Sequence, residues 1–198
     1  MGRVPRGGAL VIGIVLVVAL IAIVMILAGL YNRLVGTRVE CDNAWAQIDV
    51  QLKRRYDLIP NLVETVKGYA SHEKGTLEAV IQARQQAVAI TSDSAHVAEK
   101  AMAENVISQA LGRLFALSEA YPQLKADANF RQLQEELSST ENKIGFSRQH
   151  FNDSVGRYEQ ARQSFPTNLV AAACNFAKRD YFELSDAVQR EAPKVSFS

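Results

Sequence analysis

The feature that most constrains this chain is an uninterrupted apolar stretch near its N-terminus, residues 9–30 (ALVIGIVLVVALIAIVMILAGL). The stretch contains no charged residue and no Asn, Gln, Ser or Thr. A helix rises about 1.5 Å per residue, so this one would extend about 33 Å, enough to cross a hydrocarbon core about 30 Å thick. Backbone polar groups in lipid must be satisfied within the segment, which requires a helix. The sequence therefore predicts one membrane-spanning helix over residues 9–30, after a flank of residues 1–8.

A cleaved signal peptide is the alternative interpretation, because Arg3 and Arg6 precede the apolar run. The apolar region of a signal peptide is usually about 7–15 residues long, shorter than the stretch found here. Residues 27–30 (LAGL) resemble a lipoprotein cleavage box, but Leu30 stands where the lipidated cysteine would be required. These differences favour a retained membrane anchor.

The orientation of the anchor is left open by its flanking charges. Arg3 and Arg6 precede the span, while Arg33 and Arg38 follow it closely. Cations on short flanks set topology, and here they balance, with the N-terminal amine favouring an inside N-terminus. The sequence does not decide on which side of the membrane the rest of the chain lies.

The remaining residues, 31–192, are long enough for one helical domain with its own core. The whole chain has a formal net charge of +1, which gives no electrostatic reason to expect nucleic acid as a partner. Cys41 and Cys174 are far apart and in no metal-binding spacing. They are two thiols or one bridge, and unbridged thiols are the default expectation.

Apolar spacing predicts an all-α domain. A stripe of residues three and four apart continues from the anchor to about Tyr69, so the first helix of the domain should be continuous with the anchor and kinked at Pro60. Further helices are expected over residues 76–90, 95–120 and 127–164. A short helix is expected over 168–177, with Thr167 as its N-cap. Another turn or two within 180–190 and an extended tail over 193–198 complete the prediction.

The expected helix over 127–164 carries the most regular pattern in the domain. Large apolar residues recur every seven positions: Phe130, Leu137, Ile144, Phe151, Tyr158 and Phe165. Three positions after each of the first five stand Leu133, Thr140, Ser147, Ser154 and Ala161. Mostly small residues in that second register allow close helix packing but disfavour a free coiled-coil dimer. The pattern predicts an antiparallel, up-and-down four-helix bundle with this helix at its centre.

A search for catalytic chemistry finds no constellation that would support a reaction. His72 and Glu73 begin like a zinc-protease motif, but Thr76 stands where the second histidine is required. There is no glycine-rich phosphate loop and no nucleophile elbow. The sequence predicts a protein that is not an enzyme, with no cofactor and no metal.

Two polar clusters interrupt the apolar helices. The first contains Arg54, Arg55, Asp57, Pro60 and Asn61. It is either a recognition surface beside the kink or a structural feature, with Asp57 paired to Lys53 or Arg54 and Asn61 bonded to a carbonyl freed by Pro60; the structural interpretation is favoured.

The second cluster includes Glu141 and Asn142. The two clusters should lie at about the same distance from the membrane, which predicts that Arg54 or Arg55 meets Glu141. Removing Glu141 would then leave a buried cation and cost several kcal/mol.

These residues resemble the LemA family. The resemblance rests on the block AWAQIDVQLKRRYDLIPNLV at residues 44–63, with GYA at 68–70, TENKI at 140–144 and YFE at 181–183. It implies a bacterial single-pass membrane protein with an antiparallel four-helix bundle and no established catalytic residues. Family members are similar to a magnetosome membrane protein and are often encoded near a membrane zinc metalloprotease of the HtpX type.

Three functional hypotheses follow. The first is a homo-oligomeric scaffold in the bacterial inner membrane that organises or shapes the bilayer, with tail residues Val195 and Phe197 as candidate contacts between copies. The second is an adaptor or regulator of a membrane metalloprotease. The third, an undescribed enzyme, is disfavoured because no titratable constellation is present.

Overall fold

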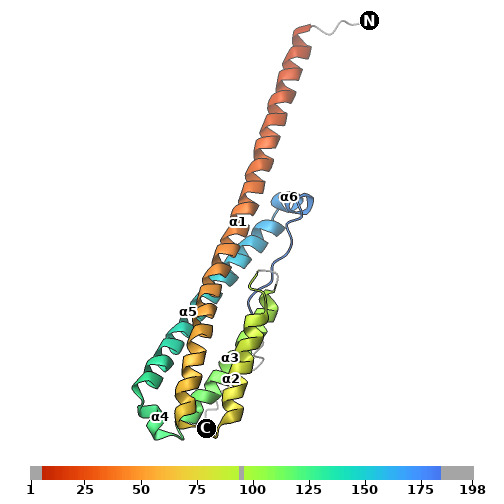
Figure 1. Cartoon of the computed structure of the whole chain (residues 1–198). Helices are drawn as coiled ribbons and strands as arrows, with labels where there is room; N and C mark the ends of the chain where they lie inside the picture. The colour runs from red at the N-terminus through yellow and green to blue at the C-terminus, as the bar shows by residue number, and fades with distance from the viewer. Residues whose placement is uncertain (1–5, 94–95, 184–198) are drawn as a thin grey trace, which may run out of the picture. The chain divides into compact units, whose positions relative to one another are not determined.

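The structure is a computed structural model that describes residues 6–93 and 96–183. These residues form helices joined by short connections, and no strand occurs among them. The helices are α1 (Arg6–Tyr69), α2 (Lys74–Ala89), α3 (Val97–Ser118), α4 (Pro122–Ala126), α5 (Ala128–Gln163) and α6 (Thr167–Ala173) (Figure 1). The prediction of an all-α chain with a long apolar N-terminal helix is confirmed. The up-and-down order of the bundle stays a prediction.

The chain divides into two compact units, which are described separately. Unit 1 comprises Met1–Cys41 and Ser154–Lys178, and unit 2 comprises Asp42–Asp153 and Arg179–Ser198. Helices α1 and α5 each contribute residues to both units.

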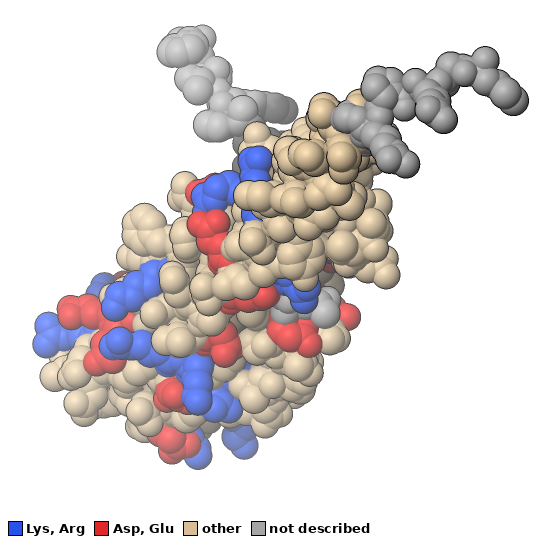
Figure 2. Space-filling view, turned by 90° about the horizontal axis from the view of Figure 1, so that it is seen from above, with Lys and Arg blue, Asp and Glu red and all other residues tan. Residues whose placement is uncertain are grey.

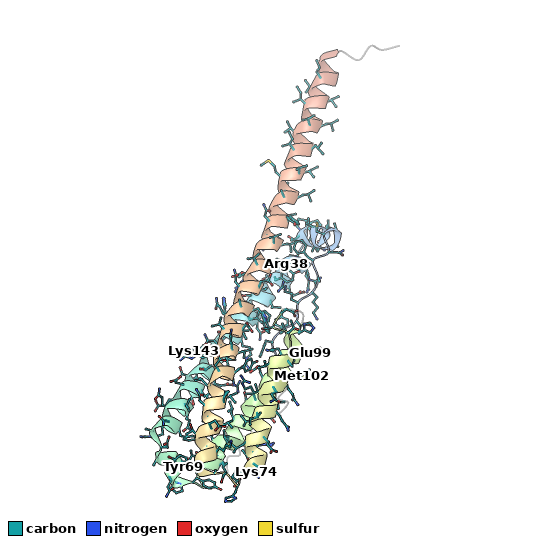
Figure 3. The ribbon with its side chains drawn as sticks, in the orientation of Figure 1. Arg38, Tyr69, Lys74, Glu99, Met102 and Lys143 are labelled. Atoms are coloured by element: carbon teal, nitrogen blue, oxygen red, sulfur yellow. The ribbon has the colours of Figure 1, made fainter. Side chains whose placement is uncertain are left out.

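In unit 1, the N-terminal part of α1 presents aliphatic side chains to its surroundings (Figure 3). Among the described helices, α1 is the one long and apolar enough to cross a membrane, by length and composition. The helix runs without interruption from Arg6 to Tyr69, so the predicted continuity beyond the apolar stretch is confirmed. The residues predicted to span a bilayer are therefore the start of a helix that reaches Tyr69.

The C-terminal part of unit 1 differs from the prediction in two places. Phe165, the last residue of the seven-residue pattern, is 81% exposed, because α5 ends at Gln163 before the pattern is complete. Thr167 is the first residue of α6, whose N-cap is Pro166 without a side-chain capping bond. Helix α6 ends earlier than expected, because Asn175 adopts φ 55° and the Phe176 N–H donates to Ala171 O at 3.0 Å, an arrangement typical of helix C-termini.

Unit 1 also contains both cysteines. Cys41 is buried and Cys174 is exposed, and no disulfide joins these two described residues. The default expectation of unbridged thiols is therefore confirmed.

In unit 2, segments of α1, α2, α3 and α5 bury apolar faces. The seven-residue pattern of α5 is confirmed here, because Phe130, Leu137, Ile144 and Phe151 are all buried. Trp45 of α1 lies 5.4 Å from Phe151 between ring centroids. These aromatic residues fill the space between helices that the small residues of the second register allow to approach.

The bounds of the remaining elements agree with the prediction to within a few residues. Helices α2 and α3 begin at Lys74 and Val97, where residues 76 and 95 were expected. Helix α4 was not predicted, although Pro122 suits the first turn of a helix because its φ is already fixed there. Residues 180–183 are not helical. The rest of the 180–190 segment, where another turn or two was expected, and the tail with Val195 and Phe197 lie outside the described residues.

Asp127 caps α5 and gives a prediction. Its carboxylate accepts hydrogen bonds from the Phe130 N–H at 2.8 Å and the Tyr69 hydroxyl at 2.9 Å, and these bonds lower the pKa of Asp127. A lowered folded-state pKa contributes stability above the unfolded pKa and loses it as pH falls through the folded value. Asp127→Asn should therefore unfold more easily at pH 7, and its deficit in urea titrations should shrink below about pH 4. A deficit that does not change with pH would contradict this assignment.

Candidate functional site

The candidate site lies in unit 2, where α3 carries charges on its buried face. Lys100 and Glu104 alternate with apolar core residues of the same helix and are at most 3% exposed. Arg55 of α1, 2% exposed, lies opposite them. Buried charges are costly unless they are paired and hydrogen-bonded. The partners of these three side chains therefore define the site, which we call the charge cluster: Arg55, Tyr56, Lys100, Glu104, Ser108 and Glu141.

Arg55 connects three helices of unit 2. Its Nη1 lies 3.3 Å from Glu104 Oε2 on α3 and 3.1 Å from Glu141 Oε2 on α5. Its Nη2 donates to Ser108 Oγ at 2.9 Å, and that hydroxyl donates to Glu141 Oε1 at 3.3 Å. One guanidinium thus satisfies two carboxylates, as its planar fork of donors allows.

Tyr56 and Lys100 complete the cluster. The Tyr56 hydroxyl donates to Glu104 Oε1, and Lys100 Nζ lies 5.2 Å from the centre of the Tyr56 ring, within the range of a cation–π contact. Lys100 Nζ also donates to Ala87 O at 2.9 Å and Ile90 O at 3.4 Å. These carbonyls end α2, where a cation is favourable because of the helix dipole.

Burial dominates the protonation equilibria of the cluster. It raises the pKa of Glu104 even though Tyr56, Arg55 and Lys100 favour the carboxylate. It lowers the pKa of Lys100, and burial together with Glu104 raises the pKa of Tyr56 far above its ordinary value. Tyr56 therefore stays a hydrogen-bond donor at physiological pH. The cluster joins α1, α3 and α5 through paired charges of opposite sign.

A groove of about 300 Å³ opens beside the charge cluster. Its polar lining includes Arg55, Ser108, Glu141 and Asn142, and its apolar lining comes mainly from Leu111, Phe115 and Leu137. Glu141 is half exposed here, while Glu104 is buried behind it. The groove could accept an apolar group that ends in a hydrogen-bonding function.

A second polar contact in unit 2 involves Pro60 and Arg84. In a regular helix the N–H of residue 60 would donate to the carbonyl of residue 56, but proline has no N–H. Arg84 Nε of α2 donates to Tyr56 O at 2.7 Å instead. The helix continues through Pro60 to Tyr69, and the kink stays a prediction.

The predicted site residues have different outcomes. Arg55 contacts Glu141, which is the contact expected from the sequence. Arg54 is exposed and lies 3.9 Å from Glu136 rather than Glu141. Asp57 is exposed and, within the described part of the chain, pairs with neither Lys53 nor Arg54. Asn61 is exposed, and Arg84 rather than Asn61 bonds the carbonyl freed by Pro60.

The energetic expectation for Glu141 needs correction. Glu141 is half exposed, and Arg55 retains Glu104 when Glu141 is removed. Truncating Glu141 therefore does not leave Arg55 alone, so we expect the larger cost for Glu104.

Sequence reasoning missed Lys100, Glu104, Ser108 and Arg84. A signal was present for three of them. Lys100 and Glu104 fall in the same three- and four-residue register as Val97, Ile107 and Leu111. Charges inside an apolar stripe indicate buried, paired groups. Arg84 likewise falls on the apolar line of its own helix, with Leu77, Val80 and Val88, whereas nothing comparable distinguishes Ser108 from other polar helix residues.

Charged residues at the surface are mixed by sign. On the face that Figure 2 shows, blue Lys and Arg side chains lie among red Asp and Glu side chains. Among the described residues, no group of three or more His, Cys, Asp and Glu side chains could hold a metal ion.

Comparison with known proteins gives one consistent family. The family model described as the LemA family matches residues 44–197. Magnetosome protein MamQ of Magnetospirillum gryphiswaldense is 24% identical, with 91% of this chain and 74% of the relative covered. Magnetosome protein MamQ 2 of Paramagnetospirillum magneticum is 23% identical, with 92% and 74% covered. Protein LemA of Metamycoplasma hominis is 27% identical, with 80% and 71% covered.

The fold and the site define a class: a membrane-associated, all-α protein whose buried charges join helices. The names of the relatives do not indicate a catalytic activity. The chain belongs to the LemA family, as its resemblance in the block at residues 44–63 predicts.

Proposed function

We propose that this chain is a non-enzymatic, single-pass protein of the bacterial inner membrane that self-associates and thereby organises or shapes the bilayer. The observation that carries the proposal is the continuity of α1 from Arg6 to Tyr69. The same helix contains the apolar segment suited to a bilayer and supplies Ile48, Leu52 and Ile59 to the core of unit 2. No flexible linker interrupts this helix. Contacts between copies of unit 2 would therefore be transmitted to the membrane-spanning segment through one continuous helix.

Exposed apolar side chains of unit 2 support self-association. Phe146 of α5 is 74% exposed, and Met102 and Val106 of α3 are also exposed. Met102 and Val106 are four residues apart and so share one face of their helix. Aromatic residues often dominate the energetics of protein interfaces, which makes Phe146 the residue to test.

The relatives support the same proposal. Two of them are named magnetosome proteins, and each aligns with more than nine-tenths of this chain. Less than a tenth of the chain lies outside either alignment, so each alignment takes in at least part of the apolar N-terminal segment together with most of the helical part. A role in organising a membrane would account for the presence of both the anchor and the helical part in one chain.

A second candidate function is an adaptor or regulator of a membrane metalloprotease. The groove beside Arg55 and Glu141 favours it, because apolar walls and a polar floor suit a segment of a partner protein. An adaptor would form small complexes with the protease instead of large assemblies of its own.

The particle mass of the full-length protein in lipid nanodiscs or mild detergent, measured by light scattering, tests the proposal. Assemblies of many copies are expected, and Phe146→Ser should reduce their mass, because the exposed ring is lost from the interface. Lys143→Ser is the matched control, since Lys143 is also exposed on α5 (Figure 3). A monomer or dimer in every preparation would contradict the scaffold. Copurification of such a small species with a membrane metalloprotease would support the adaptor instead.

A further inference from the structure

One further segment of unit 1 has the composition of a membrane contact. Residues 163–177 (QSFPTNLVAAACNFA) contain no charged side chain, although Arg162 precedes them and Lys178 follows. They include the end of α5 and all of α6. Their exposed surface includes Phe165 and Leu169, the latter 61% exposed. A water-facing surface without charge and with large apolar side chains suggests an apolar partner.

The structure places this segment beside the end of the apolar helix. A groove of about 510 Å³ is lined by Val24, Leu27, Ala28, Tyr31 and Asn32 of α1 together with Leu169, Val170, Ala173 and Cys174. Val24, Leu27 and Ala28 belong to the stretch predicted to cross the bilayer. Helix α6 therefore lies at the level of the last turns of that stretch, where hydrocarbon gives way to headgroups.

The surrounding residues fit that level. Tyr31 is partly exposed and packs edge-on against Phe176, with ring centroids 5.7 Å apart. Aromatic residues are enriched at the boundary between membrane and water. Arg33 and Arg38 are exposed on the next turns of α1, and cations there can reach the headgroups. Along α1, the apolar stretch is thus followed first by an aromatic residue and then by cations. A bilayer has the same order, from its hydrocarbon core through the interface to the headgroups.

We propose that the α6 segment, residues 163–177, is a second membrane contact. Phe165 and Leu169 insert into the interfacial layer beside α1, and an acyl chain occupies the groove between α1 and α6. The bilayer is favoured over a second copy of the chain as occupant, because the groove continues onto the apolar face that α1 itself presents to lipid. This inference rests on the proposed membrane-spanning role of α1.

The exposed thiol of Cys174 allows a direct test in the full-length chain. Cys41 is buried, so an environment-sensitive fluorophore should attach at Cys174, with Cys174→Ala as the labelling control. The protein is reconstituted in vesicles of phosphatidylcholine and phosphatidylglycerol that contain lipids with a quencher near the headgroup or near the acyl terminus. Reference labels are placed by Val17→Cys and Ser139→Cys in the Cys174→Ala background.

The label at Cys174 should be quenched more by the shallow quencher than by the deep one. The label at Val17→Cys should be quenched more by the deep quencher than by the shallow one. The label at the exposed position Ser139→Cys should be quenched by neither. Leu169→Asp should abolish quenching at Cys174, because inserting α6 would then carry a carboxylate into an apolar layer, which is unfavourable. Gln160→Asp, which adds the same charge outside the uncharged segment, should leave it unchanged.

Two results would overturn the inference while leaving the span intact. With the Val17→Cys label quenched, an unquenched and solvent-like label at Cys174 would place α6 in water. An unquenched but blue-shifted label would instead show that protein covers α6. If the Val17→Cys label is also unquenched, the proposed membrane span fails, and that outcome is distinct from the other two.

Discussion

Replacing Glu104 with alanine is expected to lower the free energy of unfolding by about 3–5 kcal/mol. Glu104 is the buried acceptor for Arg55 and for the Tyr56 hydroxyl, and it lies close enough to Lys100 to influence its pKa. Its removal leaves Arg55 with the half-exposed Glu141 and leaves Lys100 without a buried carboxylate. Breaking a buried pair costs more than the pair contributed when a remaining charge loses its buried partner, as Lys100 does here. Urea titration of the full-length protein in nanodiscs, followed by far-ultraviolet circular dichroism, gives the measurement.

Glu141→Ala is the matched comparison for Glu104→Ala. Both carboxylates contact Arg55 Nη1, at 3.1 and 3.3 Å, but the Glu141 side chain is 50% exposed. Water can therefore replace much of what Glu141 provides, and the expected cost is about 1 kcal/mol or less. Equal costs for the two substitutions would show that Arg55 depends on both carboxylates and would contradict the assignment of Glu104 as the main partner.

A double variant that removes both charges of the Arg55–Glu104 pair separates the cost of an unpaired buried charge from the cost of lost packing. In Arg55→Met combined with Glu104→Met, neither charge of the pair remains, and Met fills irregular space readily. Replacing buried ion pairs by apolar residues is often neutral or stabilising, so the double variant should be more stable than Glu104→Ala alone. If it is equally unstable, loss of packing rather than an unpaired charge explains the cost.

The helices were predictable because their signals are local. The apolar register of α5 depends on residues seven apart, and Phe130, Leu137, Ile144 and Phe151 are buried as that register requires. Phe165 continues the same spacing but is exposed, because Pro166 begins a new segment and removes it from the helix. Periodicity therefore predicts burial only as far as the helix continues.

The candidate site was only partly predictable because its members come from separate helices. Arg55 and Glu141 could be paired by estimating their distance from the membrane end of the bundle. The choice of Glu104 as the main partner depends on which side chain is buried, and its place in the α3 stripe was the available clue. The bond from Arg84 to Tyr56 O depends on the relative positions of α1 and α2, which sequence spacing does not provide.

Arg84→Met is expected to destabilise the protein by about 1–3 kcal/mol, the cost of a part-buried carbonyl without a donor. Its effect should depend on Pro60, because Pro60 is the reason that Tyr56 O lacks its helical partner. Pro60→Ala restores an N–H at this position and should stabilise the chain by up to about 3 kcal/mol, the penalty for proline within a helix. In the Pro60→Ala background, Arg84→Met should cost markedly less than it does alone.

The coupling between Pro60 and Arg84 is measured as a double-mutant cycle by urea titration of the full-length protein. Residues that share a hydrogen-bond network typically couple by about 0.5–3 kcal/mol. Arg113→Met is the control, since Arg113 is exposed on α3 and its effect should be additive with Pro60→Ala. Additive effects for Arg84→Met would mean that its bond to Tyr56 O does not compensate for the proline. A coupling of the expected size would explain how α1 continues past Pro60, because Arg84 then supplies the donor that Tyr56 O loses to the proline.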